Sequence, residues 1–196
     1  RGLVLESFPW VTDSIWVDGW FDKEWLFHVA LVPFLALGPV LGAKVFLLCA
    51  NVGVAAAFWY LARATGLSRR QAALATAAMP WLCYGIFWMR LVVCRPHVLS
   101  IALLCVGLAL TLRRRPLWLA LVSLVYALAY TGHWQLPAAV LVYDVLYIWL
   151  TADGRRRESR QWRWPLLPAA LGGMLLGELL HPGFPARSEE RRVGKE

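Results

Sequence analysis

The sequence predicts an all-α fold: a polytopic bundle of transmembrane helices, preceded by a polar outer loop and a short interfacial helix. Hydrophobic residues occupy 60% of the 196 positions and charged residues only 16%, whereas soluble domains carry about 25% charged residues. A soluble core of this size cannot bury so many apolar side chains, so the bilayer is the expected solvent. The chain also has 12 tryptophans, and tryptophan favours membrane–water interfaces.

Seven apolar segments follow one another along the chain. The first, 25–37, has 13 residues before Gly38-Pro39, and as a helix it would rise about 20 Å, less than the ~30 Å hydrocarbon core. We therefore expect this segment to be interfacial or re-entrant. The six later segments are predicted spans, the shorter ones including their aromatic ends and the second kinked at Pro80: 43–64, 71–89, 96–112, 116–131, 135–151 and 164–180.

Basic residues predict which connections share a side of the membrane. Three clusters hold 11 of the 20 Lys and Arg residues, and the positive-inside rule makes them cytoplasmic: 63–70, 113–115 and 155–163. The other connections then face the periplasm, with residues 20–28 among them if the first segment does not cross: 90–95, 131–134 and 181–185. The predicted organisation is a periplasmic loop at 1–24, an interfacial helix at 25–37 and about six spanning helices within 43–186, in a bacterial inner membrane.

Both ends of the chain differ from the rest. The chain starts with Arg1 rather than Met and shows no signal peptide, so we expect an upstream part to be missing. Residues 187–196 change composition abruptly and resemble translated sequencing-adapter read-through. We therefore expect a non-native tail there and leave it out of the fold.

Several function classes are excluded. The net charge of +8 comes mostly from Arg clusters between apolar segments, which is typical of membrane loops, so no nucleic-acid partner is expected. There is no Gly-rich phosphate loop, no Gly-x-Ser-x-Gly elbow and no paired-cysteine motif. The cysteines show no metal-type spacing, and those inside apolar segments are interpreted as packing residues: Cys49, Cys83 and Cys105, with Cys94 near a loop.

Asp22, Lys23 and Glu24 form the first polar group, at the start of the 25–37 segment. Charges beside a membrane helix often only mark the interface. The functional alternative is a site for an anionic headgroup, in which Lys23 binds phosphate and a carboxylate acts as base or metal ligand. His28 follows Glu24 by four residues, so on a helix Glu24 could orient His28. A simple N-terminal cap contact is the alternative.

Arg90 and Arg95 form the second polar group, on the predicted periplasmic side and against the positive-inside bias. An Arg fork matches the geometry of phosphate, and Pro96 puts His97 in the first turn of a helix, where anions are favoured. This combination predicts a phosphate or pyrophosphate site. The structural alternative is snorkelling of the arginines to lipid headgroups.

Two more histidines, His133 and His181, end apolar segments on the same predicted side. One histidine at a helix end is most often a surface residue, but several at one face favour a binding site. No histidine pair at i, i+4 indicates a metal, so no cofactor is assigned and a divalent metal ion stays an open alternative. Asp144, inside an apolar segment, is expected to bond a neighbouring helix.

These features resemble the GT-C type of polytopic membrane glycosyltransferases. The acidic outer loop, the short interfacial helix, the Gly turn and a span with Lys44 near its start are similar to this family, which includes protein mannosyltransferases and bacterial lipopolysaccharide sugar transferases. Shorter landmarks resemble bacterial membrane proteins of this kind, over roughly residues 4–186: Phe8-Pro9-Trp10, Ser14, residues 22–28, Pro33-Phe34, Arg95-Pro96-His97-Val98-Leu99-Ser100 and His181-Pro182.

The resemblance implies an enzyme that moves a sugar from a polyprenyl-phosphate donor to a lipid, glycan or protein acceptor at the periplasmic face. It implies one inverting displacement, in which Asp22 or Glu24 deprotonates or orients the acceptor. Basic groups would bind the donor and stabilise the departing phosphate: Lys23, His28, Arg90, Arg95, His97, His133 and His181. The family's acidic motif follows a span that would lie upstream of Arg1, so we expect this segment to be inactive by itself.

Two other hypotheses stay open. A transporter or flippase for an anionic lipid or metabolite would place Arg90, Arg95 and Asp144 along a pathway between helices. Such proteins often show inverted repeats and broken helices, whereas this sequence shows only Pro80 as a breaker and no repeat. A non-catalytic membrane partner would need the outer loop for assembly instead of activity.

Overall fold

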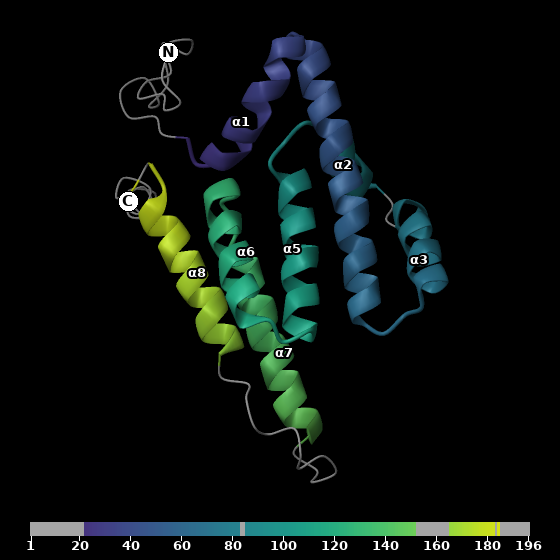
Figure 1. Cartoon of the computed structure of the whole chain (residues 1–196), viewed down its shortest axis with the longest axis vertical. Helices are drawn as coiled ribbons and strands as arrows, with labels where there is room; N and C mark the ends of the chain where they lie inside the picture. The colour runs from purple at the N-terminus through teal and green to yellow at the C-terminus, as the bar shows by residue number, and fades with distance from the viewer. Residues whose placement is uncertain (1–21, 83–84, 152–164, 183, 185–196) are drawn as a thin grey trace.

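The described part of the chain is built of helices and contains no strand. The computed structural model describes residues 22–82, 85–151, 165–182 and 184, and the predicted all-α class is confirmed for them. The predictions for the loop up to residue 21, the basic cluster at 155–163 and the tail at 187–196 lie outside the described residues. The elements, shown in Figure 1, are α1 (Trp25–Leu31), the 3₁₀ helix η1 (Val32–Leu37), α2 (Pro39–Ala64), α3 (Arg69–Leu82), α4 (Ile86–Val92), α5 (His97–Leu112), α6 (Pro116–Ala129), α7 (Gln135–Thr151) and α8 (Leu166–Leu180).

The segment predicted to be interfacial is a helical arm, α1 and η1, that folds back on α2. Gly38 joins the arm to α2 with a φ of +91°. Glycine adopts this conformation without strain because it has no Cβ atom. At Gly42 a Cβ would lie 2.1 Å from the carbonyl oxygen of Phe34, so the close approach of η1 to α2 requires glycine there. Phe46 holds the arm through edge contacts with Phe27 and Phe34, at ring-centroid distances of 5.4 and 5.3 Å.

The long helices alternate in direction along the chain, so that α2 and α5 are parallel neighbours, and so are α6 and α8. In Figure 1, α2, α5 and α7 descend while α6 and α8 ascend. The connections that follow α2 and α5, which carry basic residues, therefore lie at one end of the bundle. The start of α5, the turn between α6 and α7, and the end of α8 lie at the other end. The same alternation of chain direction was used to predict which connections share a side of the membrane.

The predicted span 71–89 is two helices instead of one. α3 ends at Leu82, and α4 begins after Gly85, whose φ of +75° is incompatible with a continuous right-handed helix. Pro80, the predicted kink, lies inside α3 and does not end it. Arg90 consequently lies in the last turn of α4, and not in a turn from 90 to 95 as predicted.

The expected extension of the short helices into their aromatic ends is wrong for α6. This helix ends at Ala129, and Tyr130 has extended backbone angles of φ −154° and ψ 137°. The ring of Tyr130 stacks on that of Tyr126, with centroids 6.0 Å apart. The chain thus leaves the helix while the aromatic contact between the two rings is kept.

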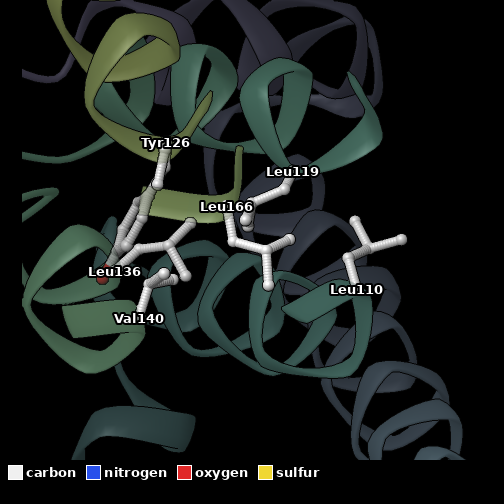
Figure 2. Packing of buried hydrophobic residues seen from close by; sticks show 7 residues of the cluster. Leu110, Leu119, Tyr126, Leu136, Val140 and Leu166 are labelled. Carbon is white, nitrogen blue, oxygen red and sulfur yellow. The ribbon is translucent and has the colours of Figure 1, made fainter. Parts of the chain in front are cut away.

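Two buried clusters hold the bundle together, and α5 contributes to both. The smaller cluster joins α2, α3, α4 and α5: Ala50, Val54, Met79, Leu91 and Val98. The larger one joins α5, α6, α7 and α8: Leu110, Leu119, Tyr126, Leu136, Val140, Leu166 and Ala170. In Figure 2 the Tyr126 ring lies beside Leu136 and Val140, at the opposite end of this cluster from Leu110. Tyr126 therefore carries the apolar core up to the polar groups described below.

Small residues allow α6 and α8 to pack closely. A Cβ on Gly173 would lie 2.0 Å from the carbonyl oxygen of Ala120, and one on Gly177 would lie 2.6 Å from that of Leu124. The two glycines are four positions apart, so they share one face of α8 and form a small-xxx-small contact. Ser123 adds a hydrogen bond by donating its hydroxyl to a backbone carbonyl of α8, 2.7 Å away.

Large apolar side chains cover much of the outer surface. Among the described residues more of them are exposed than buried, and the most exposed are Leu117 at 84%, Trp81 at 82% and Leu82 at 80%. By length and composition one described helix, α2 with its 26 residues, could cross a membrane. The helices α5 to α8 have 14 to 17 residues each. Helix length thus supports one of the six predicted spans.

Candidate functional site

Polar side chains from distant parts of the sequence meet where α5 begins, α6 turns into α7 and α8 ends. We call this region the polar end and define it by His97, Tyr130, His133, Glu178 and His181. The alternating chain direction brings these residues to one end of the bundle, where α6 packs against both α5 and α8. The three histidines predicted to share a face therefore do lie at one end of the described fold.

His133 and Glu178 form the central pair of the polar end. His133 is 2% exposed, and its Nδ1 lies 2.9 Å from the carbonyl oxygen of Tyr130. A carbonyl can only accept a hydrogen bond, so Nδ1 carries a proton and donates it. On the other side of the ring, Nε2 lies 2.6 Å from Oε1 of Glu178, whose side chain is 24% exposed.

One proton consequently lies between the His133 ring and the Glu178 carboxyl group. The pair is either an imidazolium facing a carboxylate or a neutral imidazole accepting from a carboxylic acid. The buried His133 ring holds the carboxyl group in one orientation, and the partial exposure of Glu178 leaves that group within reach of a ligand. Such an arrangement can hold and transfer a proton, as a general acid or base requires.

A short chain of polar contacts joins Ser100, Tyr126 and Gln135. The hydroxyl of Tyr126 donates to Oε1 of Gln135 at 3.2 Å. That hydroxyl also lies 3.3 Å from Oγ of Ser100, which must then be the donor because Tyr126 has only one hydroxyl proton. These bonds satisfy polar groups at the edge of the core and tie α5, α6 and α7 together.

His97 joins the polar end through Tyr130, with the two rings edge to face and 5.2 Å between centroids. Its Nδ1 is buried and has no hydrogen-bond partner among the described residues. Arg90 and Arg95 are exposed, and both lie within electrostatic range of His97. The two exposed guanidinium groups can bind an anion such as phosphate.

Asp22 and His28 form a second carboxylate–imidazole pair, at the start of α1. The spacing predicted Glu24 as the carboxylate that orients His28, but the structure pairs His28 with Asp22 instead, with Nδ1 and Oδ2 2.6 Å apart. The reason is local: the other oxygen of Asp22 accepts the backbone N–H of Glu24 at 3.0 Å, which turns Asp22 back over the first turn. Lys23, which stands between Asp22 and Glu24 in the sequence, is half-buried.

The hydrogen bond with Asp22 raises the pKa of His28, and the charges of Asp22 and Glu24 add to this, while partial burial of the ring opposes it. His28 thus has a greater tendency to be protonated than a free histidine. α1 packs against α6, and its first residues lie level with the ends of α6 and α8 in Figure 1. The Asp22–His28 pair is therefore on the side of the bundle that carries the polar end.

Glu178 was missed by the sequence interpretation. It is the one ionisable residue between 166 and 180, so the rule that singled out Asp144 as an intramembrane acid would have found it too. The pairing with His133 has no local signal, because it depends on the packing of α8 against α6. Asp144 itself lies half-buried in α7.

Within the described ranges, no group of three or more His, Cys, Asp and Glu side chains could hold a metal ion. The described cysteines Cys49, Cys94 and Cys105 are free thiols. Besides its ionisable pairs, this end of the bundle carries the two exposed arginines Arg90 and Arg95.

The fold and the polar end define a class: an all-α bundle with a largely apolar outer surface and ionisable side chains gathered at one end. Comparison of the chain with protein-family models, with curated proteins and with solved structures gave no match in any of the three.

Proposed function

We propose that this protein is a polytopic protein of the bacterial inner membrane. On this proposal the polar end faces the periplasm and transfers a sugar from a polyprenyl-phosphate donor to an acceptor. The observation that carries the proposal is the combination of two ionisable pairs and two arginines at one end of a bundle whose sides are apolar. A buried ionisable side chain such as that of His133 is costly in an apolar bundle, and it indicates a functional site by default.

The outer surface supports the membrane part of the proposal. Leu117, Trp81 and Leu82 are each at least 80% exposed, and soluble monomers rarely expose extended apolar patches. Lipid would cover these side chains. The shorter helices α5 to α8 would then require local thinning of the bilayer or the inclusion of flanking residues to match its thickness.

The polar end supports the chemical part. In sugar transfer an acceptor hydroxyl attacks the anomeric carbon while the bond from that carbon to the phosphate oxygen breaks. The acceptor proton passes to a carboxylate, and the bonding electron pair leaves with the lipid phosphate. Glu178 and Asp22 are the candidate bases, since an imidazole holds each carboxyl group at 2.6 Å. Arg90 and Arg95 would stabilise the departing phosphate.

The sugar-transfer reaction itself is taken from the resemblance to GT-C glycosyltransferases, in particular from Lys23 in the outer loop and from Arg95-Pro96-His97. Asp22 and Glu24 remain the proton acceptors that this resemblance implies, and the geometry adds Glu178. The proposal thus assigns proton transfer to carboxyl groups held by histidines, and donor binding to Lys23, Arg90, Arg95 and His97.

Turnover of a labelled polyprenyl-phosphate sugar, in membranes that contain the protein with its natural flanking sequence, tests this function. Glu178→Gln should lower turnover by about 100-fold or more, the usual contribution of a general base. Arg95→Ala and Lys23→Ala should abolish it at normal expression. Arg70→Gln, at the opposite end of the bundle, is the matched control and should leave turnover unchanged. Normal turnover in both Glu178→Gln and Arg95→Ala would remove the site assignment.

A transporter is the second candidate, favoured by one observation. The chain breaks between α3 and α4 at Gly85, and interrupted helices are a feature of secondary transporters. Flux of an anionic lipid through proteoliposomes, without covalent transfer of a sugar, would favour the transporter. Covalent transfer without flux would favour the glycosyltransferase.

A further inference from the structure

The opposite end of the bundle contains a cavity that the proposed function does not use. It lies where α2 and α5 end and α6 begins, and its volume is about 800 Å³, which is within the range of small-molecule sites. Its cationic lining consists of Arg63, Arg113 and Arg115, and no acidic residue of the described chain lines it. Three like charges repel one another across such a space, so an anion bound between them would be stabilised.

Two of the three arginines are held in place by neighbouring groups. Arg63 donates a hydrogen bond from Nη1 to the backbone carbonyl of Leu67, which fixes its guanidinium group beside the cavity. The guanidinium of Arg113 lies over the ring of Tyr60, 4.3 Å from its centroid, in a cation–π contact. A guanidinium held in this way loses little freedom when it binds, and its planar fork matches two oxygens of a phosphate.

The rest of the lining is apolar or aromatic. Val106, Leu110 and Val122 form an aliphatic wall, and Trp118, which is 60% exposed, lies at the outer surface of α6. The cavity thus combines a cationic group for an anion with a wall for hydrocarbon. Basic pockets between helices at the cytoplasmic end of membrane proteins bind anionic lipid headgroups in this way.

We propose that this cavity binds the phosphate group of an anionic ligand, held by Arg63, Arg113 and Arg115. The same chemistry could come from a phospholipid headgroup or from free phosphate, and the aliphatic wall favours the lipid. The site is separate from the polar end, which lies at the other end of the helices. The proposal for this site can therefore be tested independently of sugar transfer.

The test titrates the detergent-solubilised full chain with short-chain phosphatidylglycerol and counts bound lipid by native mass spectrometry. Saturable binding is expected, with phosphatidylcholine, which has the same tails and no net charge, binding at least tenfold more weakly. Arg113→Gln and Arg115→Gln should each weaken binding about 10- to 100-fold, as expected for loss of a charge-assisted hydrogen bond. Arg70→Gln, an exposed arginine at the same end outside the cavity, should bind as the wild type does.

A second variant keeps all three charges and fills the space instead. Val106→Trp should weaken phosphatidylglycerol binding about tenfold or more while thermal unfolding shows a folded chain. Inorganic phosphate, titrated into the protein with bound phosphatidylglycerol, separates the two sources. Competition that depends on Arg113 identifies a soluble anion as sufficient, and lipid binding without such competition identifies the headgroup with its tails. Equal binding of the two lipids, or equal losses in Arg113→Gln and Arg70→Gln, would overturn the proposal and leave the arginines as partners of the helix C-termini.

Discussion

Nε2 of His133 lies 2.6 Å from Oε1 of Glu178, which links the turn between α6 and α7 to the last turn of α8. The ring also donates from Nδ1 to the carbonyl of Tyr130, so His133 is held from both sides. Because His133 is almost fully buried, this contact stabilises the fold and also orients the carboxyl group of Glu178.

Replacing His133 should therefore destabilise the fold. We expect His133→Ala to lower the free energy of unfolding by about 2–3 kcal/mol, because it removes two hydrogen bonds from a buried position. Glu178→Gln should cost less, since the amide can still donate to Nε2. Thermal unfolding followed by circular dichroism in detergent measures both. In a cycle that uses Glu178→Ala, which removes the contact, a double variant with His133→Ala whose cost equals the sum of the two single costs would show that the residues do not interact.

The pair of Asp22 and His28 predicts a dependence on pH. The pKa of His28 is raised above its ordinary value of 6.5, chiefly by the hydrogen bond with Asp22. The pair therefore stabilises α1 fully below pH 6.5, and this contribution is lost as the pH rises through the folded-state pKa. NMR titration of labelled histidine should give a His28 pKa above 6.5, and Asp22→Asn should lower it.

The His28 resonance is assigned by its loss in His28→Gln, which separates it from the other three histidines of the chain. A titration midpoint at or below 6.5 in the wild type would contradict the pairing seen in the structure.

The contact between α6 and α8 predicts opposite effects at two neighbouring glycines. Gly173→Ala should destabilise the fold by about 1–3 kcal/mol, because its Cβ would lie 2.0 Å from a backbone oxygen and the helices must separate. At Gly172 a Cβ would meet nothing within 4 Å. Gly172→Ala should therefore be neutral or stabilise the helix by up to about 1 kcal/mol. Equal unfolding temperatures for the two variants would show that α8 does not pack on α6 through this face.

The proposed membrane topology predicts which residues a membrane-impermeant thiol reagent reaches in intact cells. In a background without the native cysteines, Lys23→Cys should be labelled from outside. Ser68→Cys, in the basic connection after α2, should be labelled only after the membrane is permeabilised. Labelling of both positions under the same condition would contradict the antiparallel arrangement across a bilayer.

Helix positions could be predicted from the sequence because their signals are local. The apolar segment from 96 to 112 corresponds to α5, and Ser68 with Gln71 forms a reciprocal capping box at the start of α3, with contacts of 2.9 and 3.3 Å. The break at Gly85 was missed because a glycine inside an apolar run does not reveal its backbone angles. A positive φ is decided by the packing of the helices on either side.

The candidate site, too, was predicted from the sequence only in part. His97, His133 and His181 were assigned to one end of the bundle because the number of helices between them sets the direction of the chain at each. The prediction that Glu24 orients His28 was wrong, and Asp22 holds that position. Helical spacing describes residues inside a helix, whereas Asp22 lies before α1 begins.

By itself, then, the sequence determined the all-α class, most helix boundaries to within a few residues but not the break at Gly85, and the gathering of histidines at one end. These follow from hydrophobicity and chain direction, which are properties of neighbouring residues. Only the tertiary structure decided that Glu178 meets His133, and that three arginines share a cavity at the opposite end. Both depend on how closely α5, α6 and α8 approach one another, and that distance is set by side chains that are far apart in the chain, such as Gly173 against Ala120.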